Sequence, residues 1–256
     1  LNLLVGRNNC GKTSVLEATQ LALSSNAVFD FGSILRNREE FIESPERLSA
    51  ACMFYGYHLE PGSRIAIVAH GGDSGAFEAA IERRSDEELR LFPATASDVL
   101  PISLVVTGSR QLHGTRIPLT SEGGFDPSSP RYMPSSDSGL PVRVVSTDSL
   151  GNDRIASLWE AVALTSEEDE VLSALRVLEP RIERMTYIGA PSVPRRRRPG
   201  MIFKLAGSDT RIRLGSMGDG MRRILALVLS AIRCRGGILL VDEIDTGLHH
   251  SAMQDM

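Results

Sequence analysis

The fold of this 256-residue chain is decided near its start, by residues Gly6-Arg7-Asn8-Asn9-Cys10-Gly11-Lys12-Thr13. This stretch matches the spacing G-x-x-x-x-G-K-[ST] of a phosphate-binding loop, which joins a strand to a helix. The apolar residues Leu1, Leu3, Leu4 and Val5 before it predict the strand, and residues 14–23 after it predict the helix. The sequence therefore predicts an α/β protein that binds a nucleotide. The alternative is a glycine-rich turn that only begins a helix.

The residue types of this loop suit a polyphosphate. Glycines let the backbone wrap closely around a phosphate, while successive N–H groups and the helix N-terminus supply partial positive charge. Lys12 is expected to reach the β- and γ-phosphates, and the Thr13 hydroxyl is expected to ligate Mg²⁺. The other expected nucleotide-binding residues of the loop are Gly6, Arg7, Asn8, Asn9, Cys10, Gly11 and Ser14.

A second motif lies near the other end of the chain. Residues 237–241 form an apolar run that ends in Asp242 and Glu243, which predicts a buried parallel strand with acids at its carboxyl end. Asp242 is expected to hold the Mg²⁺ shell, and Glu243 is expected to polarise the water that attacks the γ-phosphate. The alternative is a plain exposed strand end.

A third motif precedes an apolar helix predicted over residues 221–232. Ser216, Gly218 and Gly220 come just before or at the start of that helix, where they form a second phosphate-binding surface. Because one γ-phosphate does not need two such surfaces from one chain, the second is expected to face the nucleotide of another protomer. An ordinary glycine-rich turn is the alternative.

Composition excludes several classes of protein. With 42% hydrophobic residues, the chain can bury a sizeable core as one large domain or two lobes. It contains no apolar run of the ~18 residues that a membrane span needs and no signal pattern at Leu1, so we expect a cytoplasmic protein. Cys10, Cys52 and Cys234 are too far apart to suggest a disulfide framework or a zinc site.

The net charge of −4 is unevenly distributed along the chain. Residues 181–235 hold 13 Lys and Arg against 3 Asp and Glu, whereas the rest of the chain holds 15 against 29. Such a basic segment attracts a phosphodiester backbone, so DNA is an expected partner. Alternatively, these arginines lie beside bound nucleotide or pair with the acidic remainder. Arg195–Arg198, flanked by prolines, is predicted to be an exposed loop.

The remaining pattern predicts a β-rich segment followed by helices. We expect antiparallel strands over residues 48–57, 64–69, 77–83 and 102–106, an exposed loop over 121–140, a strand over 142–145, helices around 155–162 and over 166–179, and a hairpin of 201–205 with 211–214. Ser166 and Asp169 resemble a capping arrangement for the second of these helices. We divide the chain into residues 1–150, an N-terminal lobe; 151–200, a helical insertion and basic loop; and 201–256, a C-terminal lobe, all within one ATPase domain.

Together the three motifs resemble the ABC-type ATPase heads of SMC, RecF and OLD-like proteins, most closely the OLD-like AAA ATPases of the AAA-15 and AAA-21 groups. The resemblance rests on residues 6–18, 171–188, 215–223 and 241–250. It implies an α/β P-loop NTPase of ABC-ATPase-head type, with a mixed sheet, a β-rich lobe and a helical insertion. It also implies that Lys12 and Glu243 are catalytic, that Thr13 and Asp242 bind metal, and that Ser216, Gly218 and Gly220 contact the partner's γ-phosphate.

The resemblance further implies ATP and Mg²⁺ as cofactors and a homodimer that closes around ATP and opens on hydrolysis. Such heads act on DNA or on a fused or separate effector, commonly a Toprim nuclease, in repair or anti-phage defence. Asp245 is a candidate to reach across the dimer interface. His249 and His250 follow Glu243 too closely to be the switch histidine of these heads, and Gln111 is a weak match to their glutamine. The polypeptide is expected to continue before Leu1 and after Met256.

Two other functions stay open. A P-loop kinase that phosphorylates a small molecule would use arginines such as Arg195–Arg198 in a mobile lid, although the Asp242-Glu243 pair suits water activation better. A module that senses ATP with negligible turnover would keep the same loop. Steady-state ATP turnover that is lost in Glu243→Gln would exclude the ATP-sensing module, and phosphate transfer to a metabolite would support the kinase.

Overall fold

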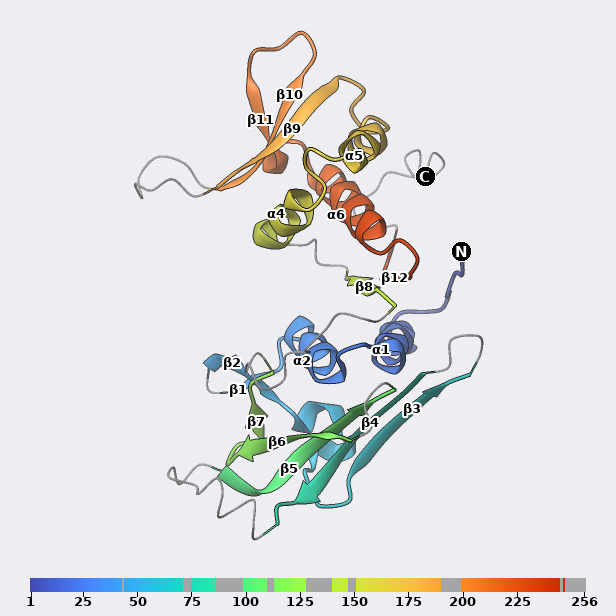
Figure 1. Cartoon of the computed structure of the whole chain (residues 1–256), viewed down its shortest axis with the longest axis vertical. Coiled ribbons are helices and arrows are strands. Elements are labelled where there is room, and N and C mark those ends of the chain that lie inside the picture. The colour runs from blue at the N-terminus through green and yellow to red at the C-terminus, as the bar shows by residue number, and fades with distance from the viewer. Residues whose placement is uncertain are drawn as a thin grey trace. The chain divides into compact units, whose positions relative to one another are not determined.

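The computed structural model describes residues 1–42, 44–70, 75–85, 99–109, 113–127, 140–146, 151–189, 199–244 and 246. The chain is a mixed α/β protein with several small sheets, and it divides into two compact units, Leu1–Val142 and Arg143–Met256. Figure 1 labels the elements of both units. No helix in the described ranges combines the length and apolar character that a membrane span requires.

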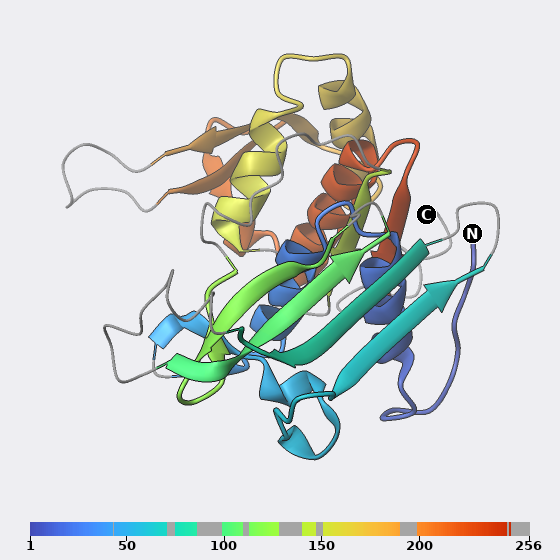
Figure 2. The same cartoon turned by 60° about the horizontal axis from the view of Figure 1, so that its bottom comes forward.

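The first unit is built on a four-stranded antiparallel sheet. Its strands lie in the order β3 (Arg64–Ala69), β4 (Gly75–Arg83), β5 (Val99–Gly108) and β6 (Thr115–Thr120). Helices α1 (Lys12–Leu23) and α2 (Ala27–Asn37) pack against this sheet, as Figures 1 and 2 show. A smaller sheet pairs β1 (Phe41–Ile42) with β2 (Ser44–Ser49) and β2 with β7 (Gly124–Phe125).

The core of the first unit lies between α2 and the sheet. Phe77, Ala79 and Ile81 alternate inward along β4 with the period of two that a strand dictates. The Phe31 ring of α2 stacks on Phe77, with centroids 5.8 Å apart, and lies 5.9 Å from the Phe125 ring. Aromatic pairs at this separation stabilise beyond the area that they bury.

A polar network joins α1 to α2. The Gln20 amide donates to Asp30 Oδ1 at 2.9 Å, and the Ser24 hydroxyl donates to the second oxygen of the same carboxylate. The Asn26 side chain accepts from Phe29 N at 3.2 Å and caps α2. Burial raises the pKa of Asp30, although the hydrogen bonds from Ser24 and Gln20 act in the opposite direction.

Three predictions for the first unit are wrong. The exposed loop predicted over residues 121–140 contains β7, where Gly124 and Phe125 are buried, and residues 128–139 lie outside the described part of the chain. Residues 1–5 form no strand, and Leu1, Leu3 and Val5 are exposed, because a strand needs a hydrogen-bonding partner and no described strand pairs with them. The predicted strand over 48–57 ends at Ser49 and is followed by 3-10 turns, since Gly56 (φ 70) and Tyr57 (φ 62) adopt left-handed backbone. The predicted strands over 64–69, 77–83 and 102–106 are confirmed.

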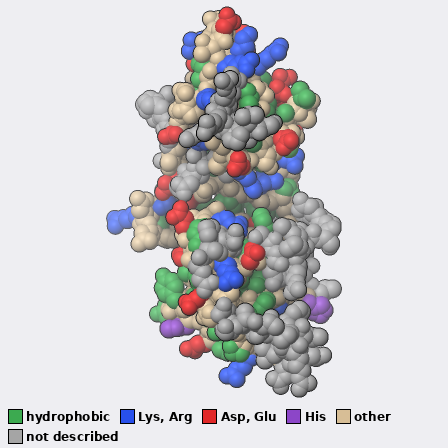
Figure 3. All heavy atoms as spheres, turned by 90° about the vertical axis from the view of Figure 1, so that its left-hand side faces the viewer, with side chains coloured by type: hydrophobic (Ala, Val, Ile, Leu, Met, Phe, Trp, Pro, Cys, Tyr) green, Lys and Arg blue, Asp and Glu red, His purple; other side chains and the backbone are tan. Residues whose placement is uncertain are grey.

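The second unit contains a three-stranded sheet and three helices. The antiparallel strands lie in the order β11 (Arg211–Arg213), β10 (Gly200–Leu205) and β9 (Ile182–Ile188). Lys and Arg side chains gather over this sheet at the upper end of the face in Figure 3. The other elements are β8 (Val142–Val145), which pairs with β12 (Ile238–Val241), and helices α4 (Asn152–Glu160), α5 (Glu167–Leu175) and α6 (Asp219–Arg233).

The centre of the second unit is α6, which packs against α4 and α5. Its core residues Leu225 and Leu229 are fully buried and belong to one cluster with Phe203 of β10, Trp159 of α4 and Leu175 of α5. The predicted hairpin of β10 and β11, the strand at 142–145 and the helices are confirmed.

The predicted cap of α5 is displaced by one residue. Ser166 makes no side-chain cap, because its own backbone is already helical. Instead Thr165 Oγ1 accepts from Glu167 N at 3.2 Å, and Glu168 Oε2 accepts from Leu164 N at 2.7 Å. The two side chains thus form a capping arrangement three residues apart, one position before the predicted pair.

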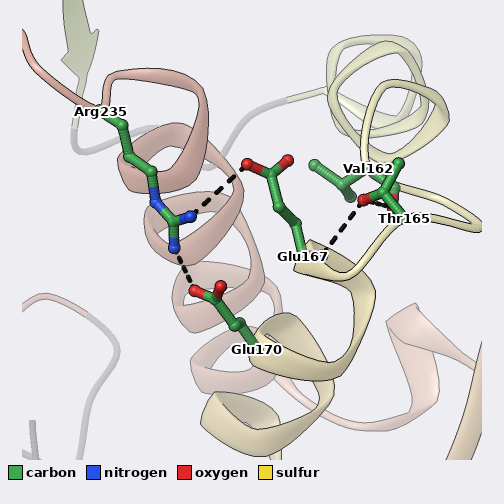
Figure 4. A network of polar contacts seen from close by, with 5 residues as sticks. All are labelled: Val162, Thr165, Glu167, Glu170 and Arg235. Atoms are coloured by element: carbon green, nitrogen blue, oxygen red, sulfur yellow. Dashed lines mark hydrogen bonds and ion pairs between the residues drawn. The ribbon is translucent and has the colours of Figure 1, made fainter.

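The start of α5 is also tied to the end of α6. The guanidinium of Arg235 lies between the carboxylates of Glu167, at 3.6 Å, and Glu170 (Figure 4). Thr165 Oγ1 donates to Val162 O at 2.7 Å beside them. Because these carboxylates are in the first turn of α5, they also meet the positive end of its dipole.

Candidate functional site

The glycine-rich loop lies at the exposed N-terminus of α1. Gly11 is the N-cap residue and has φ 88, and Asn9 has φ 61, so two left-handed residues turn the chain into the helix. Asn and Gly tolerate this backbone better than other residues. A Cβ added at Gly6 would lie 2.7 Å from Cys10 Sγ, so a larger residue at position 6 would require the Cys10 side chain to shift.

The Lys12 side chain folds back over the loop. Its Nζ atom donates to the carbonyl oxygens of Gly6 and Arg7, each at 2.8 Å. A phosphate oxygen is a stronger, charged acceptor than either carbonyl, so it can replace them as the partner of the ammonium. Thr13 and Ser14 are exposed at the first turn of α1.

The two carboxylates follow β12. Asp242 N donates to Val145 O of β8 at 2.9 Å, which extends the pairing of the two strands beyond Val241. Within β12, Leu240 is buried and the other residues are half-buried, so the predicted buried strand is confirmed only in part. The reason is that β12 has one neighbouring strand, β8, in the described part of its sheet.

Glu243 is exposed and has left-handed backbone with φ 45, a conformation that costs a residue with a side chain about 1–3 kcal/mol. Local contacts hold it there. Thr246 N donates to Glu243 O at 3.0 Å, and the Thr246 hydroxyl donates to Glu243 Oε2 at 3.1 Å. The Glu243 carboxylate therefore has a defined position at the end of the strand.

The sequence did not predict the role of Arg223, which contacts the backbone of both carboxylate residues. Arg223 lies on α6 and is 2% exposed. Its Nη2 atom donates to the carbonyl oxygens of Asp242, at 2.6 Å, and Glu243, at 3.1 Å, and Nη1 donates to that of Ser146 after β8. The planar fork of an arginine suits several acceptors at once. The available signal was an arginine that directly precedes the apolar run Ile224–Leu229 of this helix.

The serine–glycine segment borders a pocket within the second unit. Ser216 closes a 3-10 turn, and Gly218 (φ 88, ψ 165) is the N-cap residue of α6. Ser216, Arg213 and Arg222 line a pocket of about 210 Å³, together with Asn152, whose Oδ1 accepts from Arg222 Nη1 at 2.9 Å. Two guanidinium groups, a hydroxyl and an amide beside a helix N-terminus suit an anionic ligand.

The predicted site residues therefore fall into two sets. Residues 6–14 lie in the first unit, and Ser216, Gly218, Gly220, Asp242 and Glu243 lie in the second. In the second set α6 carries Gly220 in its first turn and Arg223 one turn further on. Other predictions fall outside the described residues, namely those for Asp245, His249, His250, Gln111 and Arg195–Arg198.

Thr13 in the first unit offers a hydroxyl oxygen, and Asp242 in the second unit offers a carboxylate oxygen. Each is a hard ligand of the kind that Mg²⁺ prefers. In the described ranges no three His, Cys, Asp or Glu side chains gather as a metal cage.

P-loop NTPases are defined by an α/β fold, by a glycine-rich loop with its lysine at a helix N-terminus, and by an acidic strand end. The chain has all three features. Comparison with known families agrees: the AAA_21 family, an AAA domain family associated with AbiEii toxin and type IV TA systems, matches residues 128–255. Because this match spans half of the chain, the chain belongs to that family of AAA-type ATPases. The matched residues include Ser216, Asp242 and Glu243, whereas the loop at 6–13 precedes them. No curated protein matches the chain.

Proposed function

We propose that the chain is an ABC-type ATPase head that dimerises around ATP and hydrolyses it. One observation carries this proposal. Besides the loop around Lys12, the chain has a second surface suited to phosphate, formed by Ser216 and the arginine-lined pocket beside it. Two such surfaces in one chain are explained if each serves a different nucleotide. The partner's Ser216, Gly218 and Gly220 would then close the site opened by Lys12.

Each residue has one role in the proposed reaction. Lys12 exchanges its carbonyl partners for the β- and γ-phosphates and stabilises the charge that grows on the transferred group. Glu243 orients a water molecule and accepts its proton as the water attacks the γ-phosphate. Bound Mg²⁺, held by Thr13 and Asp242, would neutralise phosphate charge. The products are ADP and phosphate, and the loss of the γ-phosphate removes what joins the protomers.

The output of this cycle is part of the proposal. Opening and closing of the dimer would gate a DNA-directed or nuclease effector, a Toprim nuclease among them, in repair or anti-phage defence. Membership of a family associated with AbiEii toxin and type IV TA systems supports a role in defence over a role in metabolism. We place the head in the cytoplasm, where ATP is available.

The test is the solution mass of the full chain carrying Glu243→Gln, measured by light scattering with and without Mg-ATP. We expect the mass to double with Mg-ATP, because bound ATP is not turned over. Adding Ser216→Arg to this variant should abolish the increase while leaving ATP bound to each protomer. Lys204→Met, which changes the only other lysine of the chain, is the control and should not alter the increase.

Four results would redirect the proposal. A monomer that binds Mg-ATP would contradict dimerisation, and phosphate transfer from it to a small molecule would indicate a kinase. Steady-state turnover that is equal in the wild type and in Glu243→Gln would remove Glu243 from the mechanism. A wild type that dimerises with ATP but does not turn it over would be a sensor.

A further inference from the structure

The outer face of the β9–β10–β11 sheet carries a row of cations. Lys204 of β10 is directly opposite Arg184 of β9 on one side and Arg211 of β11 on the other. Side chains at opposite positions point to the same face of a sheet, and all three are exposed. Neighbouring strands lie about 4.8 Å apart, so this basic row spans about 10 Å.

The opposite face of the same sheet is apolar and packed. Met201, Phe203 and Leu205 alternate with Lys204 along β10 and join the core of the second unit. The register of the strands is therefore fixed by the core, which leaves the three cations no other face to occupy. Arg213 lies on β11 two residues beyond Arg211, at the pocket that Ser216 also lines.

Like charges at opposite positions destabilise a sheet. One acid offsets the basic row, since Glu183 pairs with Lys204 at 3.0 Å, and Asp209 lies in the turn between β10 and β11. The row still carries more positive than negative charge. The cations are thus held close together although their mutual repulsion destabilises the sheet. Such a surface is complementary to a polyanion with regularly spaced charges.

We propose that the basic row of Arg184, Lys204 and Arg211 binds the phosphodiester backbone of a nucleic acid. Each strand of duplex DNA carries one phosphate per about 3.4 Å of helix axis, so flexible cationic side chains on strands about 4.8 Å apart can reach different phosphates. The contacts would be to the backbone and not to base edges, so the binding would be independent of sequence. This surface goes beyond the proposed ATPase, and its binding does not require ATP.

The test compares two triple variants of the full chain by fluorescence anisotropy without nucleotide. The first, Arg184→Gln, Lys204→Gln and Arg211→Gln, removes the basic row. The matched control, Arg83→Gln, Arg154→Gln and Arg233→Gln, removes the same charge from exposed positions elsewhere. The probes are a labelled DNA duplex, one of its single strands and an RNA duplex, each titrated at several salt concentrations.

We expect the row variant to bind the preferred probe on the order of 100-fold more weakly at about 0.1 M salt, with the log–log salt slope reduced by about 3. The control should bind within about threefold of the wild type. Thermal unfolding provides a separate check that the row variant is folded. Its Tm should equal or exceed that of the wild type, because the repulsion within the row is relieved.

Several results would overturn the proposal. Wild-type affinity in the row variant would show that the basic row does not bind nucleic acid. An equal loss of affinity in the control variant would show that only the net charge of the protein matters. Failure of the wild type to bind any of the three probes would exclude nucleic acid as the partner. Should the triple variant not fold, Lys204→Gln alone removes the central cation and should weaken binding about tenfold.

Discussion

The phosphate loop at residues 6–13 and the acidic strand end at residues 241–246 are constructed differently. The loop is exposed, and the contacts of Lys12 are to Gly6 and Arg7, within the loop itself. The strand end depends on distant residues, because Arg223 of α6 holds the Asp242 and Glu243 carbonyls and β8 accepts the Asp242 N–H. Local contacts therefore shape the loop, whereas the strand end combines the local contacts between Thr246 and Glu243 with tertiary contacts.

The difference has a consequence for mutation. A change in the loop should alter nucleotide binding and leave stability almost untouched, since the loop supports no core residue. A change at Arg223, which contacts the strand end, should alter both the free energy of unfolding and the rate of ATP turnover. Lys12→Met and Arg223→Lys test this contrast directly, whereas variants of Gly218 and Asp30 test smaller effects elsewhere in the two units.

The largest effect is expected from Lys12→Met. Removing the ammonium deletes the cationic contact that we propose for the β- and γ-phosphates. We therefore expect affinity for a fluorescent ATP analogue to fall about 100-fold or more, corresponding to at least about 2.7 kcal/mol. The unfolding temperature should stay within about 2 °C of the wild type. Lys204→Met is the control. A large loss of stability in Lys12→Met would show that the loop is not an independent segment.

The next effect is expected from Arg223→Lys. This change replaces the planar guanidinium, which donates to three carbonyl oxygens, with a single ammonium group. Unsatisfied buried acceptors cost about 1–3 kcal/mol each, so we expect unfolding free energy to fall by about 2–4 kcal/mol. We also expect kcat for ATP to fall about tenfold or more, with ATP affinity within about threefold of the wild type.

Arg233→Lys on the exposed part of α6 is the control for this variant and should change neither quantity. Amide exchange at Thr246, whose N–H bonds to the Glu243 carbonyl, gives a local readout and should accelerate in Arg223→Lys. Wild-type kcat in a folded Arg223→Lys protein would remove the link between α6 and Glu243.

A smaller effect is expected from Gly218→Ala at the N-cap of α6. With φ 88 and ψ 165, Gly218 occupies a region almost restricted to glycine, so alanine should cost about 1–3 kcal/mol in urea denaturation. Gly220→Ala, inside the first turn, is the matched control and should be neutral or stabilising by up to about 1 kcal/mol. Equal losses in both variants would indicate packing instead of backbone strain.

The smallest effect concerns Asp30, behind α1. Its folded pKa is raised above the ordinary value of 3.8, so its contribution to stability is complete below the unfolded pKa and is lost as pH rises through the folded pKa. An asparagine amide at this position cannot ionise, so Asp30→Asn should gain stability relative to the wild type as pH rises from about 3 to about 7. Guanidinium denaturation across this range measures the difference. A constant difference would show that Asp30 ionises without cost.

Most helices and strands followed from the sequence because their apolar residues recur at the period of the element. The strands at 64–69, 77–83 and 102–106 and helix α6 are examples. The errors share another cause. Residues 1–5 are apolar enough for a strand but lack a described partner, and the turns after Ser49 depend on left-handed backbone at Gly56 and Tyr57. Pairing and backbone handedness at single residues are weakly encoded in hydrophobic period.

The sequence by itself determined the motifs: a loop whose glycines and lysine suit phosphate, an acidic strand end and a serine–glycine turn before an apolar helix. These can be predicted because each depends on residues a few positions apart. Only the tertiary structure decided that Arg223 supports the acidic strand end, that Arg213 and Arg222 line a pocket with Ser216, and that three cations align across β9, β10 and β11. Packing of the apolar core brings together residues far apart in the chain, and no local pattern specifies which of them meet.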